Sequence, residues 1–171
     1  MESEARFCPR CGNALKLRPL FGRQRPSCPA CGYVHFEDPK VAVGVVAQRA
    51  GQILLTQRNH EPKMGGWSFP SGFVDAGEDV HDAATREAWE ETQIHVHIER
   101  LLGIYQEPGS RVIYLAYAGQ AGEGEPVADS ESMAVRFFPA DALPELAFVH
   151  DRAILDAWRS GHGAKLEGSE Q

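Results

Sequence analysis

Apolar residues in the middle of the chain are arranged in the short runs that are typical of strands. Residues 41–48 (VAVGVVAQ) and 52–58 (QILLTQR) are two such runs, separated by Ala50 and Gly51. Apolar runs of this length on either side of a glycine-containing turn predict two paired strands, the first of which is buried. Pro39 stands just before the first run and marks the expected start of this part of the chain.

The spacing of the apolar residues changes after residues 65–74 (GGWSFPSGFV), an extended segment that contains several glycines. Val80, Ala84 and Ala88 then recur at the spacing of one apolar stripe along a helix. Asp79 precedes this stripe, and its short carboxylate side chain suits the N-cap of a helix. The pattern therefore predicts a helix that begins near residue 80.

Strands return after this helix and lead to a second one. Three strands are expected in residues 94–107, 111–120 and 134–143. A glycine-rich loop at residues 118–126 follows the second strand, and the last helix is expected in residues 148–161. Mixed strands combined with two helices predict an α+β sandwich. Residues 161–171 show no such pattern, and we expect them to form a disordered tail.

Composition limits the class of protein. The 171 residues are 43% hydrophobic and 24% charged, which favours a globular chain over a disordered one. Residues 41–47, the longest apolar run, are too short to cross a bilayer, and the opening MESEAR lacks the pattern of a signal peptide. We therefore expect a soluble, cytoplasmic protein without a membrane partner.

The net charge of −7 is divided unevenly, because residues 1–36 contain six Lys and Arg but two acidic residues. All four cysteines lie in this basic head, as two Cys-x-x-Cys pairs formed by Cys8, Cys11, Cys28 and Cys31. Their spacing predicts a four-thiolate Zn²⁺ ribbon over residues 1–36, in which metal binding supplies folding free energy that a small core cannot. Redox or disulfide chemistry is the competing interpretation, and an expected cytoplasmic location disfavours it.

Three glutamates are crowded into five residues of the first predicted helix. Glu87 lies three and four positions before Glu90 and Glu91, so that their like charges share one face and repel each other. Arg86 can reach Glu90 across one turn, but a single guanidinium cannot neutralise the whole cluster. A solvated acidic surface is the plain alternative. A bound cation is the other interpretation, because hard carboxylate oxygens suit Mg²⁺ or Mn²⁺.

The residues around the glutamates resemble the motif of the Nudix hydrolases, G-x5-E-x7-R-E-U-x-E-E-x-G-U with U aliphatic. The matching positions are Gly72, Glu78, Arg86, Glu87, Ala88, Glu90, Glu91 and Ile94. Gln93 departs from the motif, because the family has glycine at this position at the end of the helix. The resemblance implies that residues 37–160 form a Nudix domain, an α/β/α sandwich with a mixed sheet.

The carboxylates one helical turn apart, those of Glu87 and Glu91, are the expected main ligands of the Mg²⁺ or Mn²⁺ ion. Glu90 is expected to be a shared ligand or the ligand of a second ion. Family members also use a backbone carbonyl just before the motif, and the resemblance assigns this role to Ser71.

Other acidic and basic residues of the site receive supporting or catalytic roles. We expect Arg86 to orient the glutamates and Glu78 to tie the preceding loop to the helix. In several family members the general base comes from a late loop, where Glu131 is the candidate and Glu90 its rival. A second acid that is common in that loop is replaced by Ala134.

A zinc ribbon before a Nudix domain is similar to the arrangement in NADH pyrophosphatases and the related ADP-ribose and FAD pyrophosphatases. DPK at 38–40 and LAF at 146–148 are most similar to the ADP-ribose and FAD type, and the aromatic-proline signature of the NADH type is absent. The resemblance implies hydrolysis of ADP-ribose or FAD to two monophosphates. Arg58 and Tyr105 are the candidates for contacts with a phosphate or a base.

Other functions stay open at this point. The substrate of the enzyme can instead be NADH or NAD-capped RNA. The chain can also be a non-catalytic Nudix-fold module that binds nucleotides or nucleic acid, although the modest excess of positive charge in the head does not favour nucleic acid. The resemblance also implies a homodimer, because family members often form one.

Overall fold

The computed structural model describes residues 5–161 and 164–165 of the chain. They fall into two compact units that meet between Pro39 and Lys40, whereas the sequence predicts this boundary between residues 36 and 37. The predicted disordered tail lies largely outside the described residues. The two described residues beyond Gly161 form the short strand β10 (Ala164–Lys165), which pairs with β7 (Val96–Tyr105).

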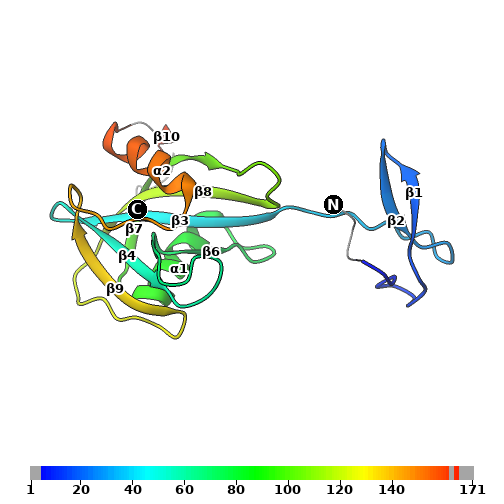
Figure 1. Ribbon diagram of the computed structural model, residues 1–171, viewed down its shortest axis with the longest axis horizontal. Helices are drawn as coiled ribbons and strands as arrows, with labels where there is room; N and C mark the ends of the chain where they lie inside the picture. Colours follow the sequence, from blue (N-terminus) through cyan, green and yellow to red (C-terminus); the bar gives the residue numbers. More distant parts are fainter. Residues whose placement is uncertain (1–4, 162–163, 166–171) are drawn as a thin grey trace. The chain divides into compact units, whose positions relative to one another are not determined.

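The first unit consists of two cysteine turns and one hairpin. The hairpin pairs β1 (Lys16–Leu20) with β2 (Arg23–Ser27), shown in blue in Figure 1. In each cysteine turn the N–H of the following glycine donates to the carbonyl of the first cysteine, at 2.9 Å for Gly12 and 3.0 Å for Gly32. Both glycines have positive φ, near +70°, which lets the backbone turn sharply after each cysteine pair.

The second unit contains one mixed sheet with the strand order β10-β7-β8-β3-β4-β5. Its remaining strands are β3 (Lys40–Arg49), β4 (Gln52–Arg58), β5 (Trp67–Ser68), β6 (Ser71–Phe73), β8 (Val112–Ala121) and β9 (Ser132–Pro139). The strands β3 and β8 run parallel, whereas the other pairs are antiparallel. The predicted glycine-rich loop is shorter than expected, because β8 continues to Ala121.

The strands β3 and β4 separate soon after the turn that joins them. They pair only through Gln48 and Arg49 of β3, and the turn residues Ala50 and Gly51 both have positive φ. Beyond this point β3 pairs with β6, while β4 pairs with β9. This divergence places β6 and the loop before β9 beside the first helix.

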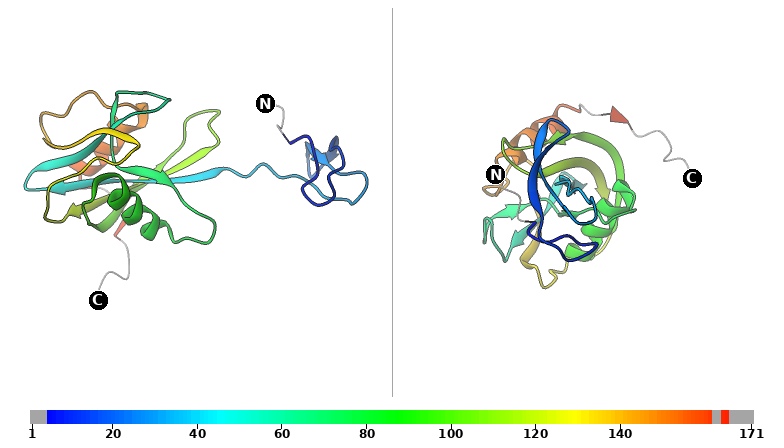
Figure 2. Two further views of the ribbon diagram at one scale, coloured as in Figure 1. Left: turned by 90° about the horizontal axis from the view of Figure 1, so that it is seen from below. Right: turned by 90° about the vertical axis from the view of Figure 1, so that its right-hand side faces the viewer.

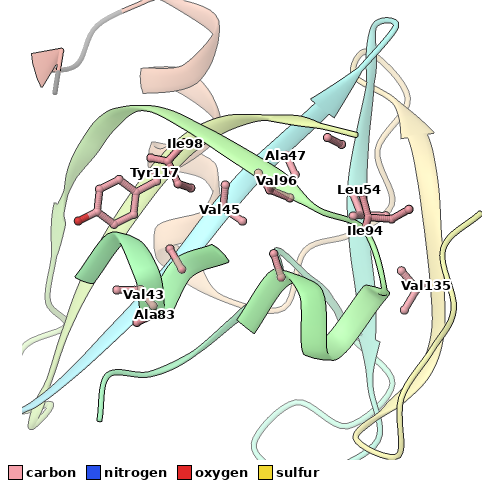
Figure 3. Close-up of a cluster of buried hydrophobic side chains, with 13 residues drawn as sticks. Val43, Val45, Ala47, Leu54, Ala83, Ile94, Val96, Ile98, Tyr117 and Val135 are labelled. Carbon is pink, nitrogen blue, oxygen red and sulfur yellow. The ribbon is translucent and has the colours of Figure 1, made fainter. Parts of the chain in front are cut away.

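The helices α1 (Val80–Thr92) and α2 (Val149–Arg159) cover opposite faces of the sheet (Figure 2). Val43, Val45 and Ala47 of β3 pack in one buried cluster with residues of α1, shown in Figure 3. Val46, which points to the other face, packs in a second cluster with residues of α2. Because both faces of β3 are covered, the strand is apolar at nearly every position.

The predicted fold, an α/β/α sandwich with a mixed sheet, is confirmed by these two cores. The start of α1 is also as predicted, because the Asp79 side chain caps it by accepting a 2.8 Å hydrogen bond from the N–H of His81. No helix within the described ranges is both long and apolar enough to cross a membrane.

Candidate active site

A cleft of about 350 Å³ lies between α1, β6 and the loop that precedes β9. Its walls are strongly acidic. They are formed by Ser71, Gly72, Phe73, Asp75, Arg86, Glu87, Glu90, Glu91, Asp129 and Glu131. The structure therefore brings the predicted carboxylates of α1 together with Ser71 and with the late-loop candidate Glu131.

Gly72 leaves space on β6 that the carboxylate of Glu87 occupies. A Cβ atom built at this position would clash with the carboxylate of Glu87, which occupies the space directly over the glycine. Gly72 also pairs with Val43 in the ladder between β6 and β3, so the strand cannot easily move away. The glycine therefore fixes the depth at which the Glu87 carboxylate sits in the cleft.

Arg86 distributes its hydrogen bonds over three carboxylates. Its Nε and Nη2 atoms donate to the two oxygens of Glu78 at 2.7 and 2.8 Å. Its Nη1 atom donates to Glu87 at 2.8 Å and to Glu90 at 3.0 Å. The bidentate pair with Arg86, joined by the N–H of Asp75, lowers the pKa of Glu78 to about 2. Glu78 thus links the loop before α1 to the helix, as expected.

Among the three clustered glutamates of α1, Glu91 is the one without a hydrogen bond from Arg86 in the described structure. It accepts a hydrogen bond of 3.3 Å from the N–H of Ser71. Burial raises its pKa to about 8, and the charges of Glu87, Asp129 and Glu131 add to this effect. Burial therefore favours the protonated form of Glu91 in the metal-free protein.

Glu87 is also half-buried, and burial is the largest cause that raises its pKa. The hydrogen bond and charge of Arg86 act in the opposite direction. The two glutamates one turn apart therefore differ. The Arg86 guanidinium stabilises the charge of Glu87, whereas burial of Glu91 favours its protonated form.

The loop before β9 adds an acid that the sequence analysis missed. Asp129 lines the cleft, and its Oδ1 atom accepts a 3.0 Å hydrogen bond from the N–H of Glu131. The backbone of this loop is attached to the end of β4, because the Asn59 N–H donates to the Glu131 carbonyl at 3.2 Å. The only available signal was the position of Asp129, two residues before a residue that was already a candidate.

Comparison with known proteins decides the family. A NUDIX domain profile matches residues 38–158. The chain belongs to the Nudix family. An ADP-ribose pyrophosphatase from Methanocaldococcus jannaschii is 35% identical over 135 residues, which are 75% of this chain and 78% of the relative.

Two further Nudix relatives extend the similarity into the cysteine-containing unit. A Nudix hydrolase from Nitrosomonas europaea, solved as a crystal structure, has a TM-score of 0.86 and 28% identity, and the match covers 94% of this chain and 96% of that one. An NAD-capped RNA hydrolase from Stutzerimonas stutzeri is 30% identical over 84% of this chain. The chain spans about half the length of that relative (51%).

The position at which the Nudix motif has glycine is occupied by Gln93, and the structure shows how it is accommodated. Gln93 adopts the left-handed conformation that glycine favours, with φ of +58°. Its N–H donates to the Trp89 carbonyl at 2.8 Å, so α1 still ends with a normal capping bond. The substitution leaves the carboxylates of the cleft in place.

The two predicted substrate contacts, Arg58 and Tyr105, lie outside the acidic cleft and close to the start of α2. The guanidinium of Arg58 lies 5.1 Å from the ring centroid of Phe148. The ring of His150 stacks on Phe148 at 5.4 Å, and Tyr105 lies on His150 at 6.4 Å. We call these four residues the aromatic cluster.

The aromatic cluster is connected to the acidic cleft through Tyr114. The Tyr114 ring lies 5.0 Å from that of His150, and its hydroxyl forms a hydrogen bond with the side chain of Ser71. Gly44 makes this possible, since a Cβ at that position would clash with the Tyr114 hydroxyl. Burial raises the pKa of Tyr114, and the carboxylates of Asp151 and Glu91 raise it further.

The donor atoms of the two units suit two different ions. The sulfurs of the four cysteines all lie within 4.8 Å of one another, which is close enough to hold one metal ion. In the described part of the chain, the glutamates of α1 do not gather three ligand oxygens this closely. An open set of hard oxygens fits an ion that keeps several water ligands and shares substrate phosphates, as Mg²⁺ does.

Proposed function

We propose that this Nudix protein hydrolyses the pyrophosphate bond of a nucleoside diphosphate derivative, ADP-ribose or FAD, and releases two monophosphates. The observation that carries the proposal is the acidic cleft, where Glu87, Glu90 and Glu91 line one wall around Arg86. A relative named as an ADP-ribose pyrophosphatase supports this choice of substrate.

Glu87 and Glu91 are the proposed main ligands of a Mg²⁺ or Mn²⁺ ion, with Glu90 and the Ser71 carbonyl completing the set. When bound, such an ion neutralises phosphate charge, polarises phosphorus and lowers the pKa of water. The excess of carboxylates over cations fits this assignment, because Arg86 is the single cation among the ten residues that line the cleft. Arg86 fixes the orientation of the Glu87 carboxylate, and the Ser71 N–H fixes that of Glu91.

Glu131 is the proposed general base, which removes a proton from the attacking water. Its position in the loop that lines the cleft together with α1 supports this role, and the half-buried Asp129 beside it restrains the backbone of the loop. Glu90 stays the rival candidate. Glu90 is more exposed than Glu87, which favours access to water. The hydrogen bond that it accepts from Arg86 occupies its carboxylate and argues against the role of base.

The aromatic cluster is the proposed site for the far end of the substrate. Aromatic rings stack on a nucleobase, and the guanidinium of Arg58 can bind a phosphate. Arg58 and Tyr105 keep in this way the substrate-binding role that the sequence predicts, together with Phe148 and His150.

For the first unit we propose a structural Zn²⁺ ion on Cys8, Cys11, Cys28 and Cys31. Thiolates prefer Zn²⁺, whereas the carboxylates of the cleft prefer Mg²⁺ or Mn²⁺. A homodimer, which the family resemblance implies, remains a prediction.

The test of the function is a substrate panel with Mg²⁺ and with Mn²⁺. It compares ADP-ribose, FAD, NADH, nucleoside triphosphates and NAD-capped RNA by product analysis. We expect ADP-ribose or FAD to give the highest kcat/KM. Preferred turnover of NADH or capped RNA would assign the other substrate class.

Glu91→Gln is the matched variant for this panel, because it removes a proposed ligand and conserves volume. We expect kcat to fall by on the order of 10²–10⁴ while the fold is kept. Arg152→Gln, a change at an exposed position of α2, is the control and should keep the wild-type rate. Binding of nucleotides without turnover of any of them would favour the non-catalytic module.

A further inference from the structure

All the charged residues of the hairpin formed by β1 and β2 are basic, and they lie on one face. In the pairing register, Lys16 faces Ser27, Arg18 faces Arg25, and Leu20 faces Arg23. Residues that face each other across a ladder, or that lie two apart along a strand, point to the same side. The side chains of Lys16, Arg18, Arg23 and Arg25 therefore share one face, which we call the basic face. The opposite face carries Leu17, Pro19, Gln24 and Pro26.

The basic face has no acidic partner. Residues 5–36 contain six Lys and Arg and no Asp or Glu. Within the part of the chain that the structure describes, no carboxylate forms an ion pair with the four cations of this face. Arg18 and Arg25 stand directly opposite each other, an arrangement of like charges that destabilises a hairpin. Folding alone thus gives no reason for this arrangement.

The turn of the same hairpin is built with an unfavourable residue. Phe21 and Gly22 both have positive φ, +50° and +75°, as a two-residue turn of this kind requires. Such turns favour Asn, Asp or Gly at the first position, and a bulky side chain there is strained. The corresponding turn between β3 and β4 has the small residue Ala50. A phenylalanine at this position of the ribbon, 74% exposed, needs another explanation.

Exposed aromatic rings adjoin the basic face. Phe21 stacks on Phe36 with ring centroids 5.9 Å apart, and Phe36 is 47% exposed. The guanidinium of Arg25 lies 4.8 Å from the ring centroid of Phe36. The Nε atom of Arg25 is buried and lacks a hydrogen-bond partner. Cations and exposed aromatic rings therefore lie together at one end of the hairpin.

We propose that the basic face and the rings of Phe21 and Phe36 bind single-stranded nucleic acid. The four cations contact backbone phosphates, and unpaired bases stack on the exposed rings, a combination that suits single strands of many sequences. The strained Phe21 turn is explained because it holds an aromatic ring at the tip of the hairpin. An acidic protein would use the cations but would leave the exposed rings without a role.

The test measures binding of the full-length, zinc-loaded protein to a labelled oligo(A) of about 12 nucleotides by fluorescence anisotropy. With four phosphate contacts, a plot of log K against log salt should have a slope of roughly −3, and Arg18→Gln should reduce its magnitude by about 0.7. Arg152→Gln removes the same charge from α2 of the other unit and should leave the slope unchanged.

Phe21→Asn is the decisive variant, because asparagine suits the left-handed conformation of the turn. We expect the zinc content to be kept and the thermal stability to be equal or higher, while affinity for the oligonucleotide falls roughly 5- to 150-fold. Leu17→Thr, on the opposite face of the hairpin, should bind like the wild type. Binding of a duplex of the same length should be insensitive to Phe21→Asn, since its bases are already stacked.

Several results would overturn the proposal. One is wild-type affinity in both Phe21→Asn and Arg18→Gln, and another is the lack of binding at low salt. Equal affinity for polyglutamate would assign the surface to an acidic protein. Self-association of the protein that is lost in Arg18→Gln would assign the basic face to contacts with the acidic second unit of another copy. Because the assay measures binding and both variants lie outside the acidic cleft, its outcome is independent of the hydrolysis tests.

Discussion

Replacing Glu91 with Gln removes a charge from the acidic cleft and conserves the volume of the side chain. The hydrogen bond from the Ser71 N–H can be kept, because the amide oxygen of Gln accepts it as the carboxylate does. The variant therefore separates the ionisation of Glu91 from its packing. Its effect on stability depends on pH, and the direction follows from the pKa.

The size of the effect can be worked out from the burial of Glu91. Its pKa is about 8 in the folded protein, compared with an ordinary value of 4.5. Between these values the folded protein holds a proton that the unfolded chain releases, so the free energy of unfolding decreases as pH rises. From pH 5 to pH 8 this contribution amounts to a loss on the order of 3 kcal/mol in the metal-free wild type. The loss is absent from Glu91→Gln.

The assay is urea unfolding of both proteins in chelator at pH 5 and pH 8. The difference between the two proteins isolates Glu91, because other groups with raised pKa values, such as Glu87 and Asp151, are present in both. Saturating Mg²⁺ should then stabilise the wild type at pH 8 and act much less on the variant, since a bound ion stabilises the state that binds it. An identical pH dependence in the two proteins would refute the buried ionisation, and equal stabilisation by Mg²⁺ would refute the role of Glu91 as a ligand.

Three further changes test other parts of the structure. Gly72→Ala forces a methyl group against the Glu87 carboxylate, so we expect thermal or urea unfolding to show a loss of about 1–3 kcal/mol together with a lower kcat. Cys28→Ser should release zinc, as metal analysis would show, and unfold residues 5–36 while leaving the sandwich folded and active; loss of the whole fold would contradict this. Glu131→Gln should lower kcat by about 10²–10⁴, whereas Asp129→Asn should lower it less. A wild-type rate and pH profile in Glu131→Gln would assign the base to another carboxylate of the cleft.

The parts of the fold that the sequence predicts are those with short-range signals. The apolar run of β3, the turn at Ala50 and Gly51, and the cap at Asp79 depend on residues close to each other in the chain, and all three are confirmed. The same holds for the cluster on α1, where one helical turn brings Glu87 and Glu91 to the same wall.

Other features depend on contacts between distant segments, which local patterns do not report. Asp129 reaches the cleft because β9 pairs with β4, and its only local signal is its place two residues before Glu131. Arg58 and Tyr105 lie on separate strands, and they come together only around the rings of Phe148 and His150 at the start of α2. The sequence predicts each of the two as a candidate, but it does not predict the cluster.

The crowded glutamates of α1 raise a question of stability that the structure answers in two ways. Arg86 forms hydrogen bonds with three carboxylates at once, those of Glu78, Glu87 and Glu90, and so offsets repulsion on one side of the helix. Glu91, beyond its reach, avoids the repulsion by keeping a proton, because burial holds its pKa near 8. A divalent cation that binds there must displace this proton. Metal affinity should therefore increase with pH up to about 8, and binding at neutral pH should release nearly one proton per site.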